Sequence, residues 1–188
     1  LALAADGYIR GKQSEETFVI NLSTSMVLEK IANKNNCKVI RTAVGEINVV
    51  EKMIEIGAEL GGEGNGGIIL KESHFGRDSL VGCAMVLNRL AQTNESLHDI
   101  YLGLPQFIIL KDKIEISSNV LNDLIMHSKR IFGDANINIE DGTKFTWDNK
   151  WIHLRKSNTE PIVRIYAEAK DEETAQDLIN KVKSFMNN

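Results

Sequence analysis

The chain has 188 residues, of which 43% are hydrophobic and 26% are charged, and its formal net charge is −4. This length is enough for one or two domains with a sizeable core. The mildly acidic balance lacks the basic stripe typical of nucleic-acid-binding proteins, and no apolar run approaches the roughly 18 residues of a membrane span. We therefore expect neither a nucleic-acid partner nor a membrane partner.

The two cysteines, Cys37 and Cys83, lie in apolar segments and have no disulfide or metal-ligand spacing. Buried free thiols of this kind are typical of a reducing compartment. We therefore expect a cytoplasmic protein.

The N-terminus is apolar, but it has no basic region in front of it and is a poor signal peptide. The alternation Leu-Ala-Leu-Ala before Asp6-Gly7 predicts the end of a β-hairpin over residues 1–13. Since the chain lacks an initiator methionine, we expect it to be cut from a longer protein.

Strand and helix patterns then alternate along the chain. Apolar runs typical of strands occupy residues 17–22, 37–44, 58–61 and 67–70. Helical spacing of apolar residues follows at 26–32, 47–57 and 78–90, and residues 23–25 (STS) can cap the first of these helices. This alternation predicts a three-layer α/β domain with a mixed, largely parallel sheet.

The pattern changes near Leu104-Pro105. A strand at 107–116, a helix at 120–132, hairpin strands punctuated by Asp-Gly at 141–142 and Asp-Asn at 148–149, a strand at 162–169 and a helix at 172–186 follow. Hairpin turns between strands are typical of antiparallel sheets. The second part therefore predicts a smaller α+β domain with an antiparallel sheet and two helices.

The loop at residues 155–161 (RKSNTEP), with Arg164 behind it, concentrates cationic and neutral donors between two predicted strands. The planar fork of arginine matches two oxygens of a phosphate, and hydroxyl and backbone N–H groups can bind the third. The pattern indicates an anion site. A surface turn with scattered charge is the alternative.

A second loop at residues 61–67 (GGEGNGG) contains five glycines in seven residues. It is neither a Walker loop nor a dinucleotide fingerprint, because no Gly-Lys-Ser/Thr follows and the next element is a strand. Its two side chains, Glu63 and Asn65, suit hydroxyl ligands, since a carboxylate accepts and a carboxamide both donates and accepts. A tight turn without function is the alternative.

Glu46, just after Gly45, follows a predicted parallel strand, and ligands of open α/β sheets gather at such carboxyl ends. The alternative is an acidic residue that favours a helix N-terminus. The four histidines show no metal spacing, and Ser157 has no identifiable base nearby. The chain thus offers groups that could bind a ligand but no obvious catalytic group.

Taken together, these motifs resemble one family, the α-D-phosphohexomutases, which include phosphoglucomutase, phosphomannomutase and phosphoglucosamine mutase. Residues 62–67 are similar to the family's sugar-binding loop and 155–161 to its phosphate-binding loop, while 42–46 (TAVGE) and 76–78 (GRD) look like further landmarks. The resemblance implies the last part of a four-domain protein. On this reading the chain divides into the tail of domain 2 at 1–13, domain 3 at 14–103 and domain 4 at 104–188.

The implied reaction moves phosphate between the 1- and 6-hydroxyls of a hexose, through a phosphoserine and a hexose 1,6-bisphosphate that is also the expected activator. Mg²⁺ is implied as the cofactor, with its Asp-x-Asp-x-Asp-Arg loop and the serine upstream of Leu1. The expected partners are a small phosphosugar and the missing N-terminal domains. This polypeptide alone is expected to bind weakly and catalyse nothing.

The resemblance assigns the non-reacting phosphate and the sugar hydroxyls to separate residues. Phosphate is expected at Arg155, Ser157, Asn158 and Thr159, with Arg164 in support, and sugar hydroxyls at Glu63, Asn65, Gly45 and Glu46. Hydroxyls O3 and O4, the expected partners of Glu63, are shared by glucose, mannose and glucosamine. The preferred hexose therefore stays open.

The sugar loop departs from the commoner bacterial form, Gly-Glu-x-Ser-Gly-His, by having Asn65 and Gly67. This departure weakens any transfer of a histidine role. A non-catalytic module that senses phosphosugars with the same loops is the alternative function.

Overall fold

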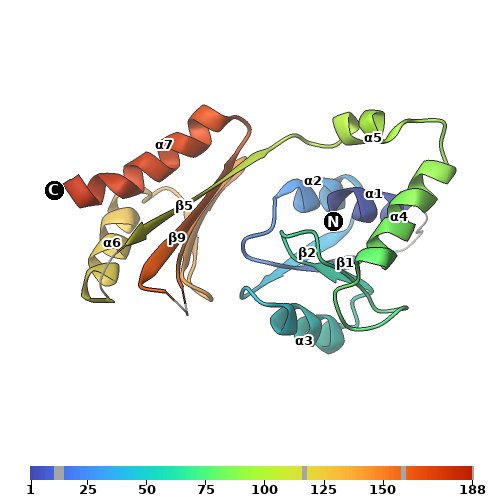
Figure 1. The fold of residues 1–188 in the computed structure, drawn as a ribbon, viewed down its shortest axis with the longest axis horizontal. Helices are drawn as coiled ribbons and strands as arrows, with labels where there is room; N and C mark the ends of the chain where they lie inside the picture. Colours follow the sequence, from blue (N-terminus) through green and yellow to red (C-terminus); the bar gives the residue numbers. More distant parts are fainter. Residues whose placement is uncertain (11–14, 116–117, 158–159, 188) are drawn as a thin grey trace. The chain divides into compact units, whose positions relative to one another are not determined.

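The computed structural model describes residues 1–10, 15–115, 118–157 and 160–187 (Figure 1). These residues form two compact units, Leu1–Gln106 and Phe107–Asn188. The assignment of residues 1–13, 14–103 and 104–188 to three successive domains of a larger protein stays a prediction.

The first unit is built on a four-stranded mixed sheet with the order β2-β1-β3-β4. Its strands are β1 (Thr17–Asn21), β2 (Lys38–Thr42), β3 (Leu60–Gly62) and β4 (Ile68–Leu70). β1 pairs in parallel with β2 and β3, and β4 returns antiparallel to β3. Phe18, Val19 and Ile20 of β1 are buried, as expected of a central parallel strand covered on both faces.

Five helices accompany this sheet: α1 (Ala2–Arg10), α2 (Val27–Lys34), α3 (Glu46–Ile56), α4 (Ser79–Ala91) and α5 (Leu97–Gly103). α3 packs on β1, β2 and β3, whereas α1 packs on α2 and α4 (Figure 1). Asp78 caps α4 by accepting hydrogen bonds from the N–H groups of Leu80 and Val81. The predicted α/β class and the mixed, largely parallel sheet are confirmed.

The N-terminal residues form α1, so the predicted hairpin was wrong. Asp6, read as a turn residue, accepts hydrogen bonds from Nε of Arg10 at 2.9 Å and Nε of Arg89 at 3.1 Å. Gly7 is needed because a Cβ there would lie 2.8 Å from Cβ of Arg89 on α4. Asp-Gly therefore marks a contact between two helices rather than a chain reversal.

The second unit is a five-stranded antiparallel sheet with the order β5-β9-β8-β7-β6. Its elements are β5 (Ile108–Glu115), α6 (Ser118–Ile131), β6 (Asn136–Asn138), β7 (Thr143–Trp147), β8 (Lys150–Lys156), β9 (Ile162–Ala169), α7 (Glu172–Lys183) and the 3₁₀ helix η1 (Ser184–Asn187). α7 packs on β5, β8 and β9 and against α6 (Figure 1). The predicted α+β class with an antiparallel sheet is confirmed.

One core fills the space between this sheet and its helices. Phe145, Leu154 and Ile165 of the sheet and Leu124 and Leu178 of the helices are each at most 1% exposed. Since side chains alternate along a strand, the neighbouring positions lie on the opposite face of the sheet. That opposite face carries the candidate phosphate residues Arg155 and Arg164.

Helix α5 begins with a capping box formed by Ser96 and Asp99, which was not predicted from the sequence.

The two cysteines differ in exposure. Cys37 is buried as expected, but Cys83 is exposed on α4, so the expectation of two buried thiols was wrong. In the described part of the chain, no helix is long and apolar enough to cross a membrane.

Candidate functional site

The glycine-rich loop between β3 and β4 is a tight turn that presents Glu63. The N–H of Gly66 donates to the carbonyl of Glu63 at 3.1 Å, and the N–H of Glu63 donates to the carbonyl of Gly67 at 3.0 Å. Gly66 has a φ of +93°, which L side chains rarely adopt. The exposed Asn65 turns its Oδ1 back to accept from the N–H of Gly67 at 3.0 Å. Asn65 therefore supports the turn, and its predicted contact with a hydroxyl stays a prediction.

Glu63 is 6% exposed as a residue, and its carboxylate is held through both oxygens. Oε1 accepts from Nδ2 of Asn21 at 2.9 Å, and Oε2 lies 3.3 Å from Nη1 of Arg77. A buried carboxylate needs such partners because the loss of hydration is otherwise costly. The two contacts fix the carboxylate while each oxygen keeps a second lone pair that can accept from a ligand.

Arg77 brings the two acidic residues predicted as sugar ligands together. Its N–H donates to Oε1 of Glu46 at 2.9 Å and its Nε to Oε2 at 2.7 Å, while its Nη1 contacts Glu63. The backbone and side-chain hydrogen bonds from Arg77 lower the pKa of Glu46. Gly45, with a φ of +134°, caps α3 and so starts the helix with Glu46 as its first residue. Glu46 therefore orients Arg77, and its direct contact with a sugar stays a prediction.

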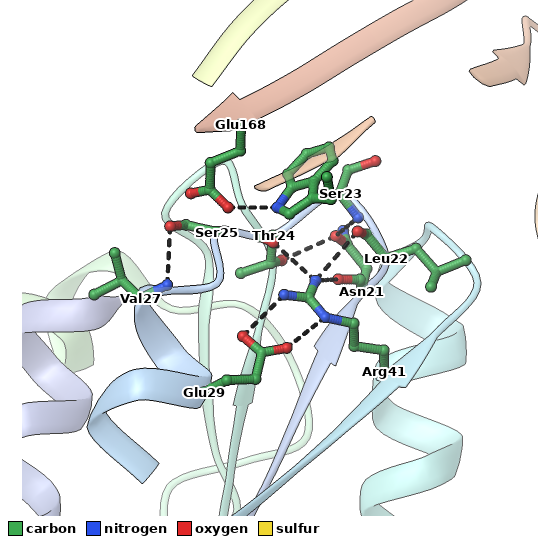
Figure 2. Close-up of polar contacts among 10 residues, drawn as sticks. Asn21, Leu22, Ser23, Thr24, Ser25, Val27, Glu29, Arg41 and Glu168 are labelled. Atoms are coloured by element: carbon green, nitrogen blue, oxygen red, sulfur yellow. Dashed lines mark hydrogen bonds and ion pairs between the residues drawn. The ribbon is translucent and has the colours of Figure 1, made fainter. Parts of the chain in front are cut away.

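The loop after β1 is fixed by Arg41 (Figure 2). Nη1 of Arg41 donates to three carbonyls, those of Asn21 at 3.0 Å, Leu22 at 3.1 Å and Thr24 at 2.8 Å. Its Nε and Nη2 donate to the carboxylate of Glu29 at 2.6 Å and 3.0 Å. A planar guanidinium can serve so many acceptors at once, which makes this loop a rigid support.

Sequence reasoning missed Asn21 as part of this site. Its Oδ1 accepts from the N–H of Ser23 at 3.0 Å and from Oγ1 of Thr24 at 2.9 Å, and its Nδ2 reaches Glu63. A polar residue at the carboxyl end of a buried parallel strand was the available signal, since ligands gather at that edge. The partner, however, lies 42 residues away in the chain.

In the second unit, Arg155 near the end of β8 is oriented by Asp141 in the β6–β7 connection. Its Nε lies 3.1 Å from Oδ1 and 2.9 Å from Oδ2 of that carboxylate. A guanidinium that is paired through Nε can still bind two phosphate oxygens through its two terminal nitrogens, so this orientation suits a bidentate contact with phosphate.

The backbone of Asp141 is held as well, by His153 of β8. Nε2 of His153 lies 2.6 Å from the Asp141 carbonyl, and since a carbonyl only accepts, this nitrogen carries the proton. Burial lowers the pKa of His153 to about 4, an effect that the bond to the carbonyl opposes. His153 is therefore neutral at physiological pH and adds no charge beside Arg155.

The loop after β8 is closed by backbone hydrogen bonds. The N–H of Ser157 donates to the carbonyl of Ile162 at 2.9 Å, and the N–H of Ile162 donates to the carbonyl of Glu160 at 2.8 Å. Ser157 is buried at 5% exposure. Asn158 and Thr159 lie outside the described residues, so their predicted contacts with phosphate stay predictions.

Strand pairing places Arg155, Arg164 and Lys113 in one row across β8, β9 and β5. Directly opposite residues of an antiparallel pair share a face, so the three cations face the same way. Lys113 and Arg164 line a shallow groove of about 430 Å³, to which Glu160 and Asp112 contribute negative charge. Lys113 was missed from the sequence, although the alternation along β5 was a signal for it.

The described residues contain no group of three or more His, Cys, Asp or Glu side chains that could hold a metal ion. The expected Mg²⁺ therefore has no ligand set among these residues, and none of them is assigned to it.

Comparison with known families gives a match along both units. A family described as "Phosphoglucomutase/phosphomannomutase, alpha/beta/alpha domain III" matches residues 1–107, and its "C-terminal domain" matches residues 112–184. The first match contains the glycine-rich loop at residues 61–67, and the second match contains the loop at residues 155–161.

Individual relatives point the same way. The chain is 32% identical over 182 residues to a phosphoglucomutase/phosphomannomutase of Thermococcus kodakarensis, which covers 95% of this chain and 39% of the relative. It is 29% identical over 181 residues to a phosphoglucosamine/phosphogalactosamine mutase of Sulfurisphaera tokodaii, covering 95% of this chain and 40% of that protein. The chain therefore spans about two fifths of the length of these relatives.

Solved structures support the fold. A phosphoglucomutase/phosphomannomutase family protein of Burkholderia thailandensis superposes with a TM-score of 0.80 at 22% identity. The superposition covers 97% of this chain and 40% of that one. At this identity the likeness concerns the fold alone.

Proposed function

Because this chain belongs to the phosphoglucomutase/phosphomannomutase family, we propose that it is the sugar- and phosphate-binding part of a hexose phosphate mutase. The observation that carries the proposal is the Glu63 carboxylate, which is almost fully buried at the start of the glycine loop and oriented through both oxygens. An acceptor held in this way suits the hydroxyls of a sugar. The row of cations beside the 155–161 loop supports the phosphate half of the proposal.

In the proposed cycle, a phosphoserine outside these residues transfers its phosphoryl group to the free 6- or 1-hydroxyl of a hexose phosphate. The P–O bond to the serine breaks as the bond to the sugar oxygen forms, and the proton of the sugar hydroxyl is taken up in net terms by the released serine oxygen. The bisphosphate then turns around and returns its other phosphate to the serine. Mg²⁺, bound outside these residues, would supply neutralisation of the charge on the transferring group.

The residues of this chain bind and orient the sugar throughout that cycle. Arg155 and Arg164, with Ser157, Asn158 and Thr159 of the same loop, hold the phosphate that is not reacting. Their cationic and neutral donors suit a dianion in either orientation of the sugar.

Glu63 accepts from neighbouring hydroxyls, O3 and O4, whichever end of the sugar is reacting. Asn65 and the Gly45–Glu46 pair complete the proposed sugar site. Glucose, mannose and glucosamine share these hydroxyls and differ at C2. We therefore propose hexose phosphates as the substrate class, and a cytoplasmic metabolic enzyme as the protein to which this chain contributes.

The phosphate half is tested by Arg155→Ala in the full-length enzyme that contains this chain. Charge-assisted hydrogen bonds are each worth about 1.5–3 kcal/mol, so kcat/KM should fall at least about tenfold for both the 1- and 6-phosphates. Arg130→Ala removes an exposed arginine from α6 and should leave kcat/KM unchanged. Wild-type efficiency in Arg155→Ala would remove Arg155 from the phosphate site.

The sugar half is tested by Glu63→Gln, which keeps the shape of the side chain and removes its negative charge. Turnover of glucose, mannose and glucosamine 1-phosphates should fall while the melting temperature stays close to that of the parent. Glu51→Gln, at an exposed position on α3, serves as the charge-matched control. Turnover equal to the parent's would exclude the hydroxyl role of Glu63.

A further inference from the structure

We propose that Asn21 is a positioning residue that sets the orientation of the Glu63 carboxylate and thereby the affinity for the sugar. The inference rests on the proposed function of Glu63 and adds a residue that neither glycine loop nor phosphate loop contains. Asn21 is the last residue of β1, and its side chain is 4% exposed.

The chemistry of a carboxamide is required at this position. On one side Asn21 donates through Nδ2 to Oε1 of Glu63, and on the other its Oδ1 accepts from Ser23 and Thr24. The backbone N–H of Ser23 can only donate, which identifies the oxygen, and so the nitrogen must face Glu63. An aspartate could accept the same two bonds, but its carboxylate could not donate to Glu63.

The support behind Asn21 is rigid, whereas the support on the other side of Glu63 is exposed. β1 is the strand between β2 and β3, and Arg41 ties the following loop to three carbonyls. Arg77, which contacts the other oxygen of Glu63, has a side chain that is 43% exposed. Fixed geometry at a binding group depends on packed, hydrogen-bonded neighbours. Both partners of Glu63 are hydrogen-bonded, Arg77 to Glu46 and Asn21 to Ser23 and Thr24, but only Asn21 is also buried.

Loss of the Asn21 donor should let the Glu63 carboxylate turn toward Arg77. The ion pair with Arg77 is already formed at 3.3 Å, and a guanidinium can donate to both oxygens of a carboxylate at closer range. The carboxylate would then be engaged by the protein at the expense of the sugar hydroxyls. The defect should therefore appear as weaker sugar binding more than as slower chemistry.

The experiment uses Asn21→Asp in the full-length enzyme, assayed with glucose 1-phosphate and glucosamine 1-phosphate from pH 5.5 to 8. At the high end the new carboxylate faces Glu63, so KM should rise about tenfold or more while kcat stays within about threefold. At the low end a proton retained between the two carboxyl groups restores a donor, so KM should fall back toward the parent value. Titration of the substrate phosphate at about pH 6 affects KM of the parent and of the variant alike, so the restored donor is read as the difference between the two profiles.

Charged groups around the new carboxylate bear on that profile. Arg77 faces Glu63 from the segment just before α4, and Glu46 faces Arg77 from α3. Arg41 and Glu29 lie on the other side of the loop, paired with each other. All of these are present in the parent as well, so the difference between the two profiles isolates position 21.

Asn33→Asp is the charge-matched control. It introduces the same carboxylate at an exposed position of α2 and leaves the hydrogen bond from Asn21 to Glu63 in place. Its KM should stay within about twofold of the parent at every pH. A KM for Asn21→Asp that equals the parent's across the whole range overturns the inference.

The double variant Asn21→Asp with Glu63→Gln separates positioning from stability. Two facing carboxylates should lower the melting temperature of Asn21→Asp. In the double variant the introduced glutamine amide can donate to the carboxylate at position 21, so the melting temperature should return toward the parent value while KM stays high at all pH values. A double variant that recovers its KM along with its melting temperature overturns the inference. If Glu63→Gln alone has parental kinetics, the proposed function of Glu63 fails and this inference fails with it. If Glu63→Gln is impaired and Asn21→Asp is not, the positioning role alone fails.

Discussion

Asp141 connects two residues of β8 that lie beside the predicted phosphate loop. Its carboxylate orients Arg155, and its carbonyl accepts a hydrogen bond from His153. A protonated His153 would place a second cation beside this arrangement, and its burial prevents that at neutral pH. Protonation of one imidazole is thus linked to the stability of the second unit.

The stability of the fold should decrease as the pH is lowered because of His153. Its pKa is lowered to about 4 in the folded state from 6.5, so the unfolded chain binds the proton first as the pH falls. The stabilisation is complete above pH 6.5 and is lost as the pH falls toward 4, by about 3 kcal/mol. Urea denaturation at several pH values between 4 and 7.5 measures this loss.

His153→Gln is the reference for that measurement. Glutamine keeps a donor for the Asp141 carbonyl but does not titrate. Carboxylates contribute their own dependence in both proteins, so the difference between the two curves reports the histidine. Parallel curves for parent and variant would contradict the role of His153.

Single residues of the site were predictable where their local sequence was unusual. Glu63 lies in a glycine-rich loop and Arg155 lies at the end of β8, next to a loop rich in hydrogen-bond donors, so the sequence neighbours of both residues already indicate binding. Asn21 and Asp141 look ordinary in sequence, and their importance depends on partners brought in by strand pairing and by a hairpin. A contact between distant residues has no local pattern from which to read it.

At the scale of elements, long periodic segments were predicted well and short ones were not. The helices α3, α4, α6 and α7 and the strands β1 and β2 lie close to their predicted positions. α5 has seven residues and follows a short loop, which is too little for helical periodicity to show. The apolar start of α1 was predicted as a strand because Leu and Ala alternate there. Both residues are also good helix formers, so the same alternation is equally compatible with a helix.

The contact between α1 and α4 gives a test of that correction. Gly7→Ala should destabilise the chain by about 1–3 kcal/mol, because the new methyl would overlap the buried stem of Arg89. This exceeds the gain of about 1 kcal/mol that alanine ordinarily brings to a helix interior. Chemical denaturation of the 188-residue chain measures the change.

Gly103→Ala, at the end of α5, is the control for this substitution. A Cβ there meets nothing within 4 Å, so the variant should be as stable as the parent or slightly more stable. Equal stability of Gly7→Ala and Gly103→Ala would mean that α1 does not approach α4 as closely as described.

For the whole molecule, the second unit has a hydrophobic core of its own. The buried cluster around Leu124, Phe145, Ile165 and Leu178 draws its members from residues 114–182, all within that unit. A polypeptide of residues 107–188 should therefore unfold cooperatively, with a free energy of about 4–12 kcal/mol for its size. Circular dichroism during urea denaturation tests this, and a broad transition without a baseline would contradict it.

Because Cys83 is exposed and Cys37 is buried, a thiol-reactive dye can be attached selectively to one of the two cysteines. A maleimide dye should react with Cys83 on α4 while Cys37 stays shielded by the fold. A second cysteine introduced on an exposed position of α6, for example at Met126, would carry the other dye. Energy transfer between the two dyes would then report whether the distance between Cys83 and position 126 changes in solution as phosphosugar is added.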